Sequence, residues 1–409
     1  MQNIKNFTEW FVGFSDGEAC FLIVKKSNSG SGVRFSFVFQ LGLHRDDLEV
    51  LTYIAKTLGI GRVTVDEKEA ECRYIVSDIA GVEKLIVLFD EFNLNTTKHM
   101  DYLAFKKAFF LYRDREGVVT ESLVEEILKI KSGMNNNRTD FTYPVDHRIN
   151  ITSSWLLGFV EAEGSFHLYR DTLAPAFTIA MSIAQLPVVV KIKEFLVENL
   201  GFDDSSKWKV ENSELIGVHT QAARGTTLGA VRVTIRNVHI LKAYVIPFFK
   251  NLGLISKKGK DLNDFETICR IIYYGGHKDD KIKSLILKLS YTMNNFRLSN
   301  SKKAGEALSL QEMTLLNNAL PHLEHLADGR IVHIETGRVV DQNNIVLITH
   351  ADGVVSRVLT VEEAAKILNI SRTTLGNYFR KSDTEGIEVK GCQVKRVRVF
   401  HPYSAGECK

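Results

Sequence analysis

The stretch Trp10-Phe-Val-Gly-Phe-Ser-Asp-Gly-Glu-Ala-Cys-Phe21 decides the fold, because a second copy follows as Trp155-Leu-Leu-Gly-Phe-Val-Glu-Ala-Glu-Gly-Ser-Phe166. The copies share Trp, Gly, Phe, an acid, Glu and Phe at a constant offset. Each copy is followed by a similar ending, Met134-Asn-Asn-Asn-Arg138 in the first and Met293-Asn-Asn-Phe-Arg297 in the second. A sequence repeated at domain spacing indicates two units of one fold, arranged about a pseudo-two-fold axis by analogy with a two-fold homodimer.

The repeat divides the chain of 409 residues into two units, a linker and an extension. Residues 1–138 form the first expected unit and residues 151–300 the second. Residues 139–150 contain Pro144 and mixed polar side chains, which is typical of a linker. Residues 301–409 lie outside the repeat. In both units strand-like segments and then amphipathic helices follow the motif, so we expect an α+β fold.

Composition excludes several classes of protein. Hydrophobic residues make up 44% of the chain, enough for a sizeable core, yet no apolar run approaches membrane-spanning length. The net charge of +3 leans only weakly toward a nucleic-acid partner. Five scattered cysteines form no C-x-x-C pair, so a zinc site or a disulfide framework has little support. The first residues show no signal or transit pattern, so we expect the protein to stay in the compartment where it is made, without a membrane partner.

Small residues recur on one face of each motif. Residues 8–17 are predicted to be helical, and Gly13 and Gly17 lie four positions apart, which puts them on the same helix face. Gly158 and Ala162 repeat that spacing. Small residues at this spacing let two helix backbones approach closely. Because glycine inside a helix costs about 1 kcal/mol relative to alanine, a compensating contact is expected, and we predict that the two motif helices pack together.

Acidic residues close both motif helices. They are Asp16 and Glu18 in the first copy and Glu161 and Glu163 in the second. Packing the helices together would gather these carboxylates, which repel one another unless a cation lies between them. A hard divalent cation such as Mg²⁺ fits that need, and carboxylates, waters and phosphates around it make a hydrolytic site. The alternative is an ordinary interface helix whose terminal acids are solvated.

The segments Gly13-Phe-Ser-Asp-Gly-Glu-Ala19 and Gly158-Phe-Val-Glu-Ala-Glu-Gly164 resemble the LAGLIDADG motif of homing endonucleases from its glycine onward. The resemblance covers roughly residues 5–300. It implies two αββαββα units whose saddle-shaped antiparallel sheets hold a long, asymmetric double-stranded DNA site in a monomeric chain. It also implies site-specific double-strand cleavage across the minor groove, leaving short 3′ overhangs. Ala19, where the family often has glycine, leaves the acid in place and is not expected to inactivate the site.

The resemblance assigns different roles to the four acids. The last acid of each motif binds the catalytic metal in this family, which corresponds to Glu18 and Glu163. The expected ion is Mg²⁺, with Mn²⁺ or Ca²⁺ able to occupy the same site. The earlier acids, Asp16 and Glu161, are expected to support the helix ends rather than the metal.

The family also places one lysine of each unit near the active site, at the start of a late helix. Lys98 matches that pattern in the first unit. In the second unit we favour Lys260, with Lys257 and Lys258 as rivals. Such a lysine would offset negative charge developing at a phosphate, whereas a solvated lysine at a helix start is the alternative interpretation.

Gln185 stands at the end of a predicted strand, next to the second motif in the expected fold. Its amide is suited to orienting the water that attacks phosphate. We take Leu43 as its counterpart in the first unit, which has no polar group. Any such role of Gln185 is therefore expected to be asymmetric.

Alternating strands are expected to carry the DNA-binding surface. Phe35, Phe37 and Phe39 alternate with a mostly polar row, and Phe177 and Ile179 alternate with such a row in the second unit. The apolar rows are predicted to pack on helices and the other rows to face solvent, where arginines, hydroxyls and amides can reach bases and phosphates. A merely solvated sheet face is the alternative for any single strand. The residues expected to contact DNA are Arg34, Ser36, Gln40, Arg73, Thr178, Ser182, Arg232, Thr234 and Arg236.

The extension contains a second DNA-binding candidate at residues 360–380. Thr360 and Glu363 form a capping-box pattern at the start of one helix, and Ser371 is placed to begin another. The pair is similar to the helix-turn-helix units appended to intron-encoded nucleases, although a helical hairpin used for packing is the alternative. The residues expected to reach bases or phosphates are Arg372, Thr373 and Asn377.

Two classes of function remain open from the sequence. The first is an active metal-dependent DNA endonuclease. The second is a binding protein: an intron RNA maturase, or a regulator that binds DNA without cutting it. The retained Glu18 and Glu163 argue against a purely degenerate fold but do not exclude a protein that is both maturase and nuclease. The family implies a protein encoded by an intron, in an organelle (mitochondrion or chloroplast) or in a microbial cytoplasm.

Overall fold

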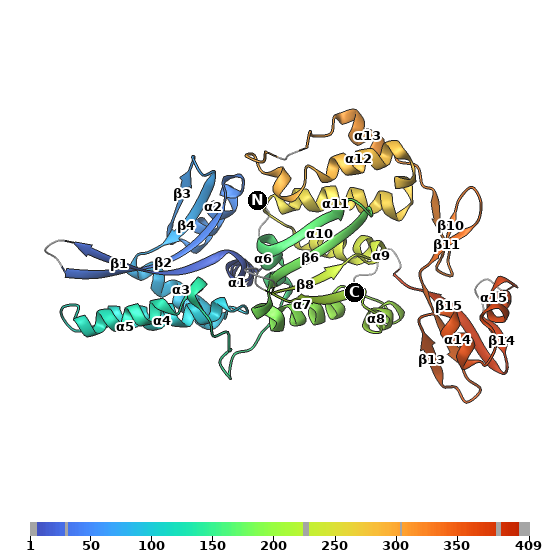
Figure 1. Ribbon diagram of the computed structural model, residues 1–409, viewed down its shortest axis with the longest axis horizontal. Helices are drawn as coiled ribbons and strands as arrows, with labels where there is room; N and C mark the ends of the chain where they lie inside the picture. Colours follow the sequence, from blue (N-terminus) through green and yellow to red (C-terminus); the bar gives the residue numbers. More distant parts are fainter. Residues whose placement is uncertain (1–5, 29–31, 224–228, 303–304, 382–385, 401–409) are drawn as a thin grey trace.

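The protein consists of two like units and a smaller extension, placed one after another along its long axis (Figure 1). The structure is a computed structural model that describes residues 6–28, 32–223, 229–302, 305–381 and 386–400. In the described part of the chain, no helix is both long and apolar enough to cross a membrane.

The first unit is built around an antiparallel sheet of four strands in the order β1-β2-β4-β3. The motif helix begins the unit and the other helices cover one face of the sheet. Its elements are α1 (Phe7–Glu18), β1 (Ala19–Asn28), β2 (Gly32–His44), α2 (Leu48–Leu58), β3 (Arg62–Asp66), β4 (Glu71–Val76), α3 (Ile79–Glu91), α4 (Lys98–Arg113) and α5 (Glu121–Ser132).

The second unit repeats this topology with the strand order β5-β6-β8-β7. Helix α8 lies between α7 and β7 and has no counterpart in the described part of the first unit. The elements are α6 (Ser153–Glu163), β5 (Gly164–Tyr169), β6 (Ala174–Ser182), α7 (Leu186–Asn199), α8 (Asp204–Glu211), β7 (Ile216–Gln221), β8 (Ala230–Ile235), α9 (Val238–Ile240), a π-helical turn (Leu241–Val245), α10 (Ile246–Leu252), α11 (Lys258–Tyr273) and α12 (Asp280–Ser290). The predicted α+β fold with paired αββαββα units is confirmed.

Alternation along the strands builds the core as expected. Phe35, Phe37, Phe39 and Leu41 of β2 are all buried beneath the helices. Phe21 of β1 packs against Phe39 with ring centroids 5.4 Å apart. Because successive strand residues point to opposite faces, Arg34, Ser36, Val38 and Gln40 are left on the other face of the sheet.

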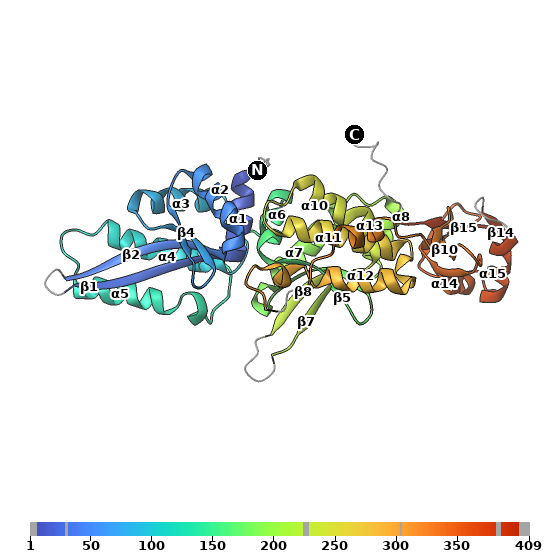
Figure 2. The ribbon, with the colours of Figure 1, turned by 90° about the horizontal axis from the view of Figure 1, so that it is seen from above.

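Helices α1 and α6 cross at the centre of the molecule, with their backbones in direct contact (Figure 2). A Cβ added to Gly13 would lie 2.0 Å from the carbonyl oxygen of Trp155, and one added to Gly158 would lie 2.0 Å from the carbonyl oxygen of Trp10. A Cβ added to Gly17 would lie 2.2 Å from the Cβ of Ala162. The predicted small-residue faces therefore form the interface between the units.

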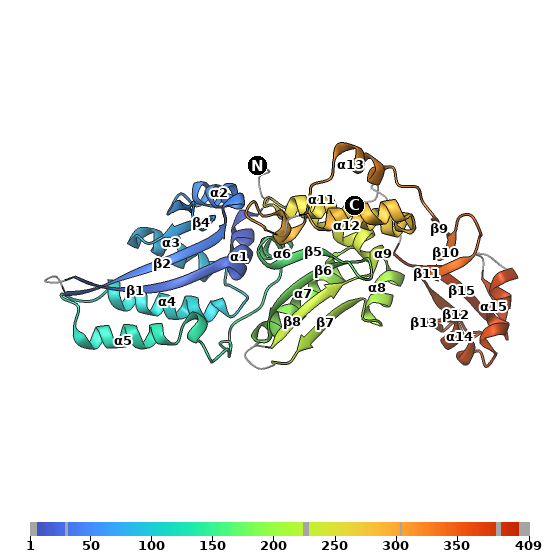
Figure 3. The same ribbon diagram turned by 45° about the horizontal axis from the view of Figure 1, so that its top comes forward.

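The extension joins two small sheets to a pair of helices (Figure 3). Ala364 of the first helix and Leu375 and Phe379 of the second pack against Ile348 and Val394 of the larger sheet. The predicted pair is thus part of a sheet-backed domain. The elements are α13 (Leu310–Asn317), β9 (Leu323–His325), β10 (Arg330–His333), β11 (Val339–Gln342), β12 (Asn344–Thr349), β13 (Val355–Val358), α14 (Val361–Ile367), α15 (Arg372–Lys381), β14 (Ile387–Val389) and β15 (Cys392–Arg398), with sheet orders β11-β10-β9 and β13-β12-β15-β14.

Replacing Gly13 with alanine is expected to destabilise the protein strongly. The added methyl group would meet the backbone of Trp155 at 2.0 Å, and backbone cannot move aside as a side chain can. We expect Gly13→Ala to lower the free energy of unfolding by at least about 2 kcal/mol, measured by urea unfolding. The control is Gly376→Ala, since that helical glycine has no atom within 4 Å of an added Cβ. It should be neutral or stabilise by up to about 1 kcal/mol. Equal effects of the two variants would contradict the assigned contact.

Candidate active site and nucleic-acid surface

Glu18 and Glu163 end the two crossing helices and come together at the interface. Burial and the neighbouring Glu163 raise the pKa of Glu18 to about 7, against the opposing effect of Lys98 and Lys258. Burial also raises the pKa of Glu163, opposed by the same two lysines. The site therefore holds two carboxylates that are costly to charge without a further cation.

Lys98 and Lys258 occupy equivalent places, each as the first residue of its helix, α4 or α11. The Lys98 ammonium donates to the carbonyl oxygens of Gly17 and of Asp16, the latter at 3.2 Å. The Lys258 ammonium donates to the carbonyl oxygens of Glu161 at 2.8 Å and Ala162 at 2.7 Å. Burial lowers the pKa of both lysines. Each ammonium thus lies at the negative end of a motif helix.

The choice of Lys260 in the second unit was wrong. Lys260 is exposed, whereas Lys258 makes the contacts with the end of the motif helix that Lys98 makes in the first unit. The sequence held a signal that decides between the rivals. Lys98 and Lys258 each precede an aspartate by three positions, Asp101 and Asp261, and Lys260 does not.

Asp16 and Glu161 hold the loops that lead into the lysine helices. The Asp16 carboxylate accepts hydrogen bonds from the backbone N–H groups of Asn95 at 2.8 Å and Thr96 at 2.9 Å, and from the Trp155 indole at 2.8 Å. Glu161 receives the backbone N–H groups of Ile255 at 2.5 Å and Ser256 at 3.1 Å. Burial raises the pKa of both carboxyl groups, and these hydrogen bonds oppose the rise. Their contacts match a supporting role at the helix ends.

The repeated Met-Asn-Asn endings fix the lysine helices from the other side. Asp101 accepts the backbone N–H of Asn135 at 2.9 Å and the Arg138 guanidinium at 2.8 Å. The Asn135 side chain donates to the carbonyl oxygen of Phe21 at 3.0 Å. The second unit repeats these contacts with Asp261, Asn294, Arg297 and Phe166 at 3.0, 2.7 and 2.9 Å. Neither aspartate was identified from the sequence, although each is followed by its own Met-Asn-Asn segment.

Gln185 crosses the interface to the loop of the first unit. Its amide accepts the backbone N–H of Thr97 at 3.1 Å and donates to the Thr97 hydroxyl at 2.5 Å. Asp47 does the same in the opposite direction, accepting the backbone N–H of Lys257 at 2.9 Å and pairing with its ammonium at 2.5 Å.

The structural counterpart of Gln185 is therefore Asp47, and the pairing with Leu43 was wrong. Both residues directly precede the helix that follows the first hairpin, α7 or α2. The offset between the copies changes there, because β1 and β2 span 10 and 13 residues whereas β5 and β6 span 6 and 9.

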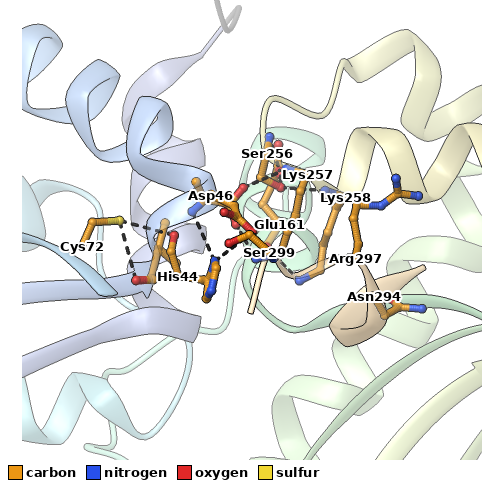
Figure 4. Close-up of polar contacts among 12 residues, drawn as sticks. His44, Asp46, Cys72, Glu161, Ser256, Lys257, Lys258, Asn294, Arg297 and Ser299 are labelled. Atoms are coloured by element: carbon orange, nitrogen blue, oxygen red, sulfur yellow. Dashed lines mark hydrogen bonds and ion pairs between the residues drawn. The ribbon is translucent and has the colours of Figure 1, made fainter. Parts of the chain in front are cut away.

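Further contacts close the interface beside this site (Figure 4). Asp46 accepts the backbone N–H of Ser299 at 2.8 Å and lies 3.0 Å from the His44 ring. On the other side, Glu161 faces Ser256, and Lys258 reaches back toward the motif helix. Segments distant in sequence are thus bound to one another around the paired helix ends.

The first sheet presents the predicted polar row on the face opposite its core. Arg34 and Arg73 are exposed, and Ser36 and Gln40 are half-exposed. The Arg73 guanidinium pairs with Glu71 at 2.6 Å. All four predicted residues share one face, because Arg73 lies opposite Gly42 in the register and Gly42 continues the row of Gln40.

The second sheet matches its prediction in part. Ser182 and Arg232 are exposed, and Arg236 lies just after β8 with its guanidinium 4.4 Å from the Tyr169 ring centroid. Thr178 and Thr234 are only 8% and 7% exposed, and their hydroxyls lie 3.4 Å apart. The expectation that these two hydroxyls are open to DNA was wrong, since they lie opposite each other on central strands and are covered by their neighbours.

In the extension, the capping box of Thr360 and Glu363 is present at the start of α14. Arg372, Thr373 and Asn377 are exposed on α15, and Asn377 accepts a hydrogen bond from Arg380 at 2.7 Å. The three predicted residues therefore lie on the solvent side of the second helix.

Comparison with known proteins agrees with this architecture. The family model described as LAGLIDADG endonuclease matches residues 11–109 and 156–269. "Probable intron-encoded endonuclease Cox1-I1b" of Schizosaccharomyces pombe is 33% identical over 216 residues, 52% of this chain and 54% of that protein. The chain thus matches only about half the length of that relative. "Uncharacterized mitochondrial protein RF1" of Saccharomyces cerevisiae is 22% identical over 400 residues, 92% of this chain and 79% of that protein.

Solved structures show the same fold. The LAGLIDADG homing endonuclease I-GzeII, in complex with its DNA target, superposes with a TM-score of 0.57 at 24% identity, covering 71% of this chain and 99% of that chain. I-LtrWI, bound to target DNA, superposes with a TM-score of 0.59 at 22% identity, covering 71% and 99%. With two matched copies of the family model, one on each unit, the chain belongs to the LAGLIDADG endonuclease family.

Proposed function

We propose that the protein is a homing endonuclease, a monomer that cuts both strands of a long, asymmetric DNA site. The observation that carries this proposal is the pair Glu18 and Glu163, retained in both copies and brought together at the ends of the crossed helices. The exposed polar rows of the two sheets support DNA as the substrate. The two solved relatives compared above, I-GzeII and I-LtrWI, are each bound to target DNA, which adds support from proteins of the same fold.

The residues at the helix ends fit a divalent cation. Burial raises the pKa values of Glu18 and Glu163, and repulsion by Glu163 adds to the rise at Glu18, so a bound cation would offset charge that is costly when both are ionised. Among the described residues, no third His, Cys, Asp or Glu joins them as a possible ligand. Two carboxylates alone suit Mg²⁺, which keeps several waters and takes phosphate oxygens as further ligands. Mn²⁺ or Ca²⁺ is expected to occupy the same position.

The reaction follows from what these groups do. Glu18 and Glu163 would hold the cation, which when bound supplies Lewis-acid activation of water and phosphate. Lys98 and Lys258 flank the carboxylates and present positive charge to a phosphate entering the site. Gln185 and Asp47 form hydrogen bonds with the loops before the lysine helices and so position these loops. Because their polar groups are engaged in these bonds, fewer donors and acceptors remain to orient the attacking water. Water attacks phosphorus and the 3′ oxygen leaves as a hydroxyl, once on each strand. Two such cuts staggered across the minor groove would give short 3′ overhangs.

The names of the relatives support an origin in an organellar intron. The compared relative from Schizosaccharomyces pombe is called intron-encoded, and the one from Saccharomyces cerevisiae is called mitochondrial. We therefore place the protein in the same setting, within the compartment that holds such introns.

Cleavage is expected to depend on the two motif acids. We predict that the wild-type protein with Mg²⁺ cuts a randomised DNA library at specific sites, and that a Glu18→Gln, Glu163→Gln double variant binds DNA without cutting it. Glutamine keeps the size of the side chain but cannot carry the negative charge that holds a cation. Sequencing of the cut ends measures the result.

Other outcomes separate the alternatives. Cutting by the double variant would remove these acids from the active site. Binding of DNA without cutting by either protein would favour a DNA-binding regulator, and preferential binding of intron RNA would favour a maturase.

Lys258 and Lys260 offer a matched pair of variants on the same helix turn. Lys258→Met removes the ammonium that lies at the end of α6, and we expect the cleavage rate to fall about 100-fold, the scale of losing one electrostatic group. Lys260→Met removes an exposed ammonium and should leave the rate within about twofold. Single-turnover cleavage of a selected site measures both. A larger loss with Lys260→Met than with Lys258→Met would contradict the assignment of Lys258 to the active site.

The raised pKa of Glu18 predicts a pH-dependent cost in the metal-free protein. Its folded-state pKa of about 7 exceeds the ordinary value of 4.5, so the folded state binds the proton more tightly and stability falls as pH rises through this window. At about pH 8 in EDTA, we expect Glu18→Gln to raise the free energy of unfolding by about 3 kcal/mol, with little effect at about pH 4.5.

Urea unfolding at the two pH values measures this difference. Glu163→Gln should act in the same direction, because the pKa of Glu163 is also raised. A Glu18→Gln variant that is less stable than the wild type at the higher pH would show that the charged carboxylate is not repelled in the folded protein.

A further inference from the structure

A second basic site lies away from the helix interface, where the extension meets the second unit. The cavity there has a volume of about 560 Å³. It is lined by side chains from α8 of the second unit and from β10, α15 and β15 of the extension. The second unit and the extension lie next to each other (Figures 1 and 3). Among the described residues, Glu362 is the one acid that lines the cavity, and the cationic lining residues are Lys209, Arg330, Arg372, Arg380 and Arg396.

Arg396 is the most buried of these arginines, and its hydrogen bonding is incomplete. Its side chain is 12% exposed, its guanidinium stacks 4.3 Å from the Phe379 ring centroid, and its Nε has no hydrogen-bond partner. The nearest carboxylate, Asp328, is 3.9 Å away and already bonds Arg330 at 2.5 Å. Burial and the charge of Arg330 lower the pKa of Arg396. A buried donor without an acceptor is costly, which indicates that an acceptor comes from outside the chain.

Lys209 contributes a cation from the second unit. Burial lowers its pKa, and its ammonium donates to the carbonyl oxygen of Asn344 at 3.1 Å. The same junction is held by the backbone N–H of Phe400, which donates to the Ser206 hydroxyl at 2.8 Å. The cavity walls are therefore bound to each other and do not depend on a ligand to meet.

The charges do not balance within the cavity. Five cationic side chains line the cavity, but only two carboxylates lie in or near it, those of Glu362 and Asp328, among the described residues. The Glu362 carboxylate already pairs with Lys366 at 3.3 Å. Arginines gathered around a concave surface match the oxygens of a phosphate better than any neutral ligand.

We propose that this cavity binds a backbone phosphate of duplex DNA that flanks the cleavage site. The proposal rests on the proposed function. Arg372 lines the cavity and also belongs to the exposed face of α15 with Thr373 and Asn377, so a phosphate in the cavity would fix that helix against the duplex. A helix facing bases with phosphate contacts beside it is the arrangement of DNA-binding helix pairs. Lys209 would tie the same phosphate to the nuclease unit.

The experiment compares two double variants of the full-length protein. Arg372→Gln with Arg380→Gln removes two exposed charges of the cavity. The control, Arg357→Gln with Lys395→Gln, removes two exposed charges of the same domain. Both residues pair with Leu347 in the strand register, so they lie on the sheet face away from Val346, Ile348 and the helices. Binding of a labelled DNA duplex of arbitrary sequence, in EDTA, is measured across a salt titration.

We expect the cavity variant to weaken binding about tenfold or more and to reduce the slope of log K against log salt by about 1 to 2, one for each lost phosphate contact. The control should change the affinity by less than about threefold. Thermal unfolding checks that both double variants fold. If the cavity double variant does not fold, Arg380→Gln alone replaces it and is expected to show about half the change in slope.

Equal effects of the two double variants on a DNA duplex that the wild type binds would overturn this inference while leaving the nuclease proposal intact. A cavity variant that weakens binding of an RNA duplex but not of DNA would overturn the assignment to DNA. Absence of any DNA binding by the wild type would overturn both proposals.

Discussion

The contact of two helix backbones at Gly13 and Gly158 is the constraint on which the rest of the structure depends. No side chain separates the helices there, since each glycine faces the carbonyl oxygen of a tryptophan in the other helix. This approach carries the ends of α1 and α6 to one place and buries Glu18 and Glu163 together. The unfavourable charge that results is what the proposed divalent cation would offset. Packing, electrostatics and chemistry therefore share one cause.

The polar contacts around this centre are duplicated almost completely. In each unit an acid in the motif helix holds a loop, the loop starts a helix with a lysine, and an aspartate one turn later receives the Met-Asn-Asn segment. The units differ where they reach across to each other, because Gln185 supplies a neutral amide and Asp47 supplies a charge. The asymmetry of these polar contacts is thus concentrated in those between the halves.

Much of this was predictable from the sequence, for physical reasons. The spacing of Gly13 and Gly17 identified the packed helix face, and the alternation of Phe35, Phe37 and Phe39 identified the buried side of a sheet. Lys260 was chosen wrongly because three lysines occur within four positions and the helix phase decides among them. Leu43 was chosen wrongly because hairpins of unequal length shift the offset. The burial of Thr178 and Thr234 depends on neighbouring strands, which local pattern does not describe.

The reciprocal anchoring of the two units has a consequence for how such proteins can be recombined. The Trp155 indole of the second unit bonds Asp16 of the first, Gln185 bonds Thr97, and Asp47 of the first unit bonds Lys257 of the second. Each unit therefore completes the loop geometry of the other. A chimaera that joins this N-terminal half to the C-terminal half of another family member would inherit one partner of each bond. Interchangeable halves require that these cross-contacts be transplanted as a set, together with the strands proposed to contact DNA.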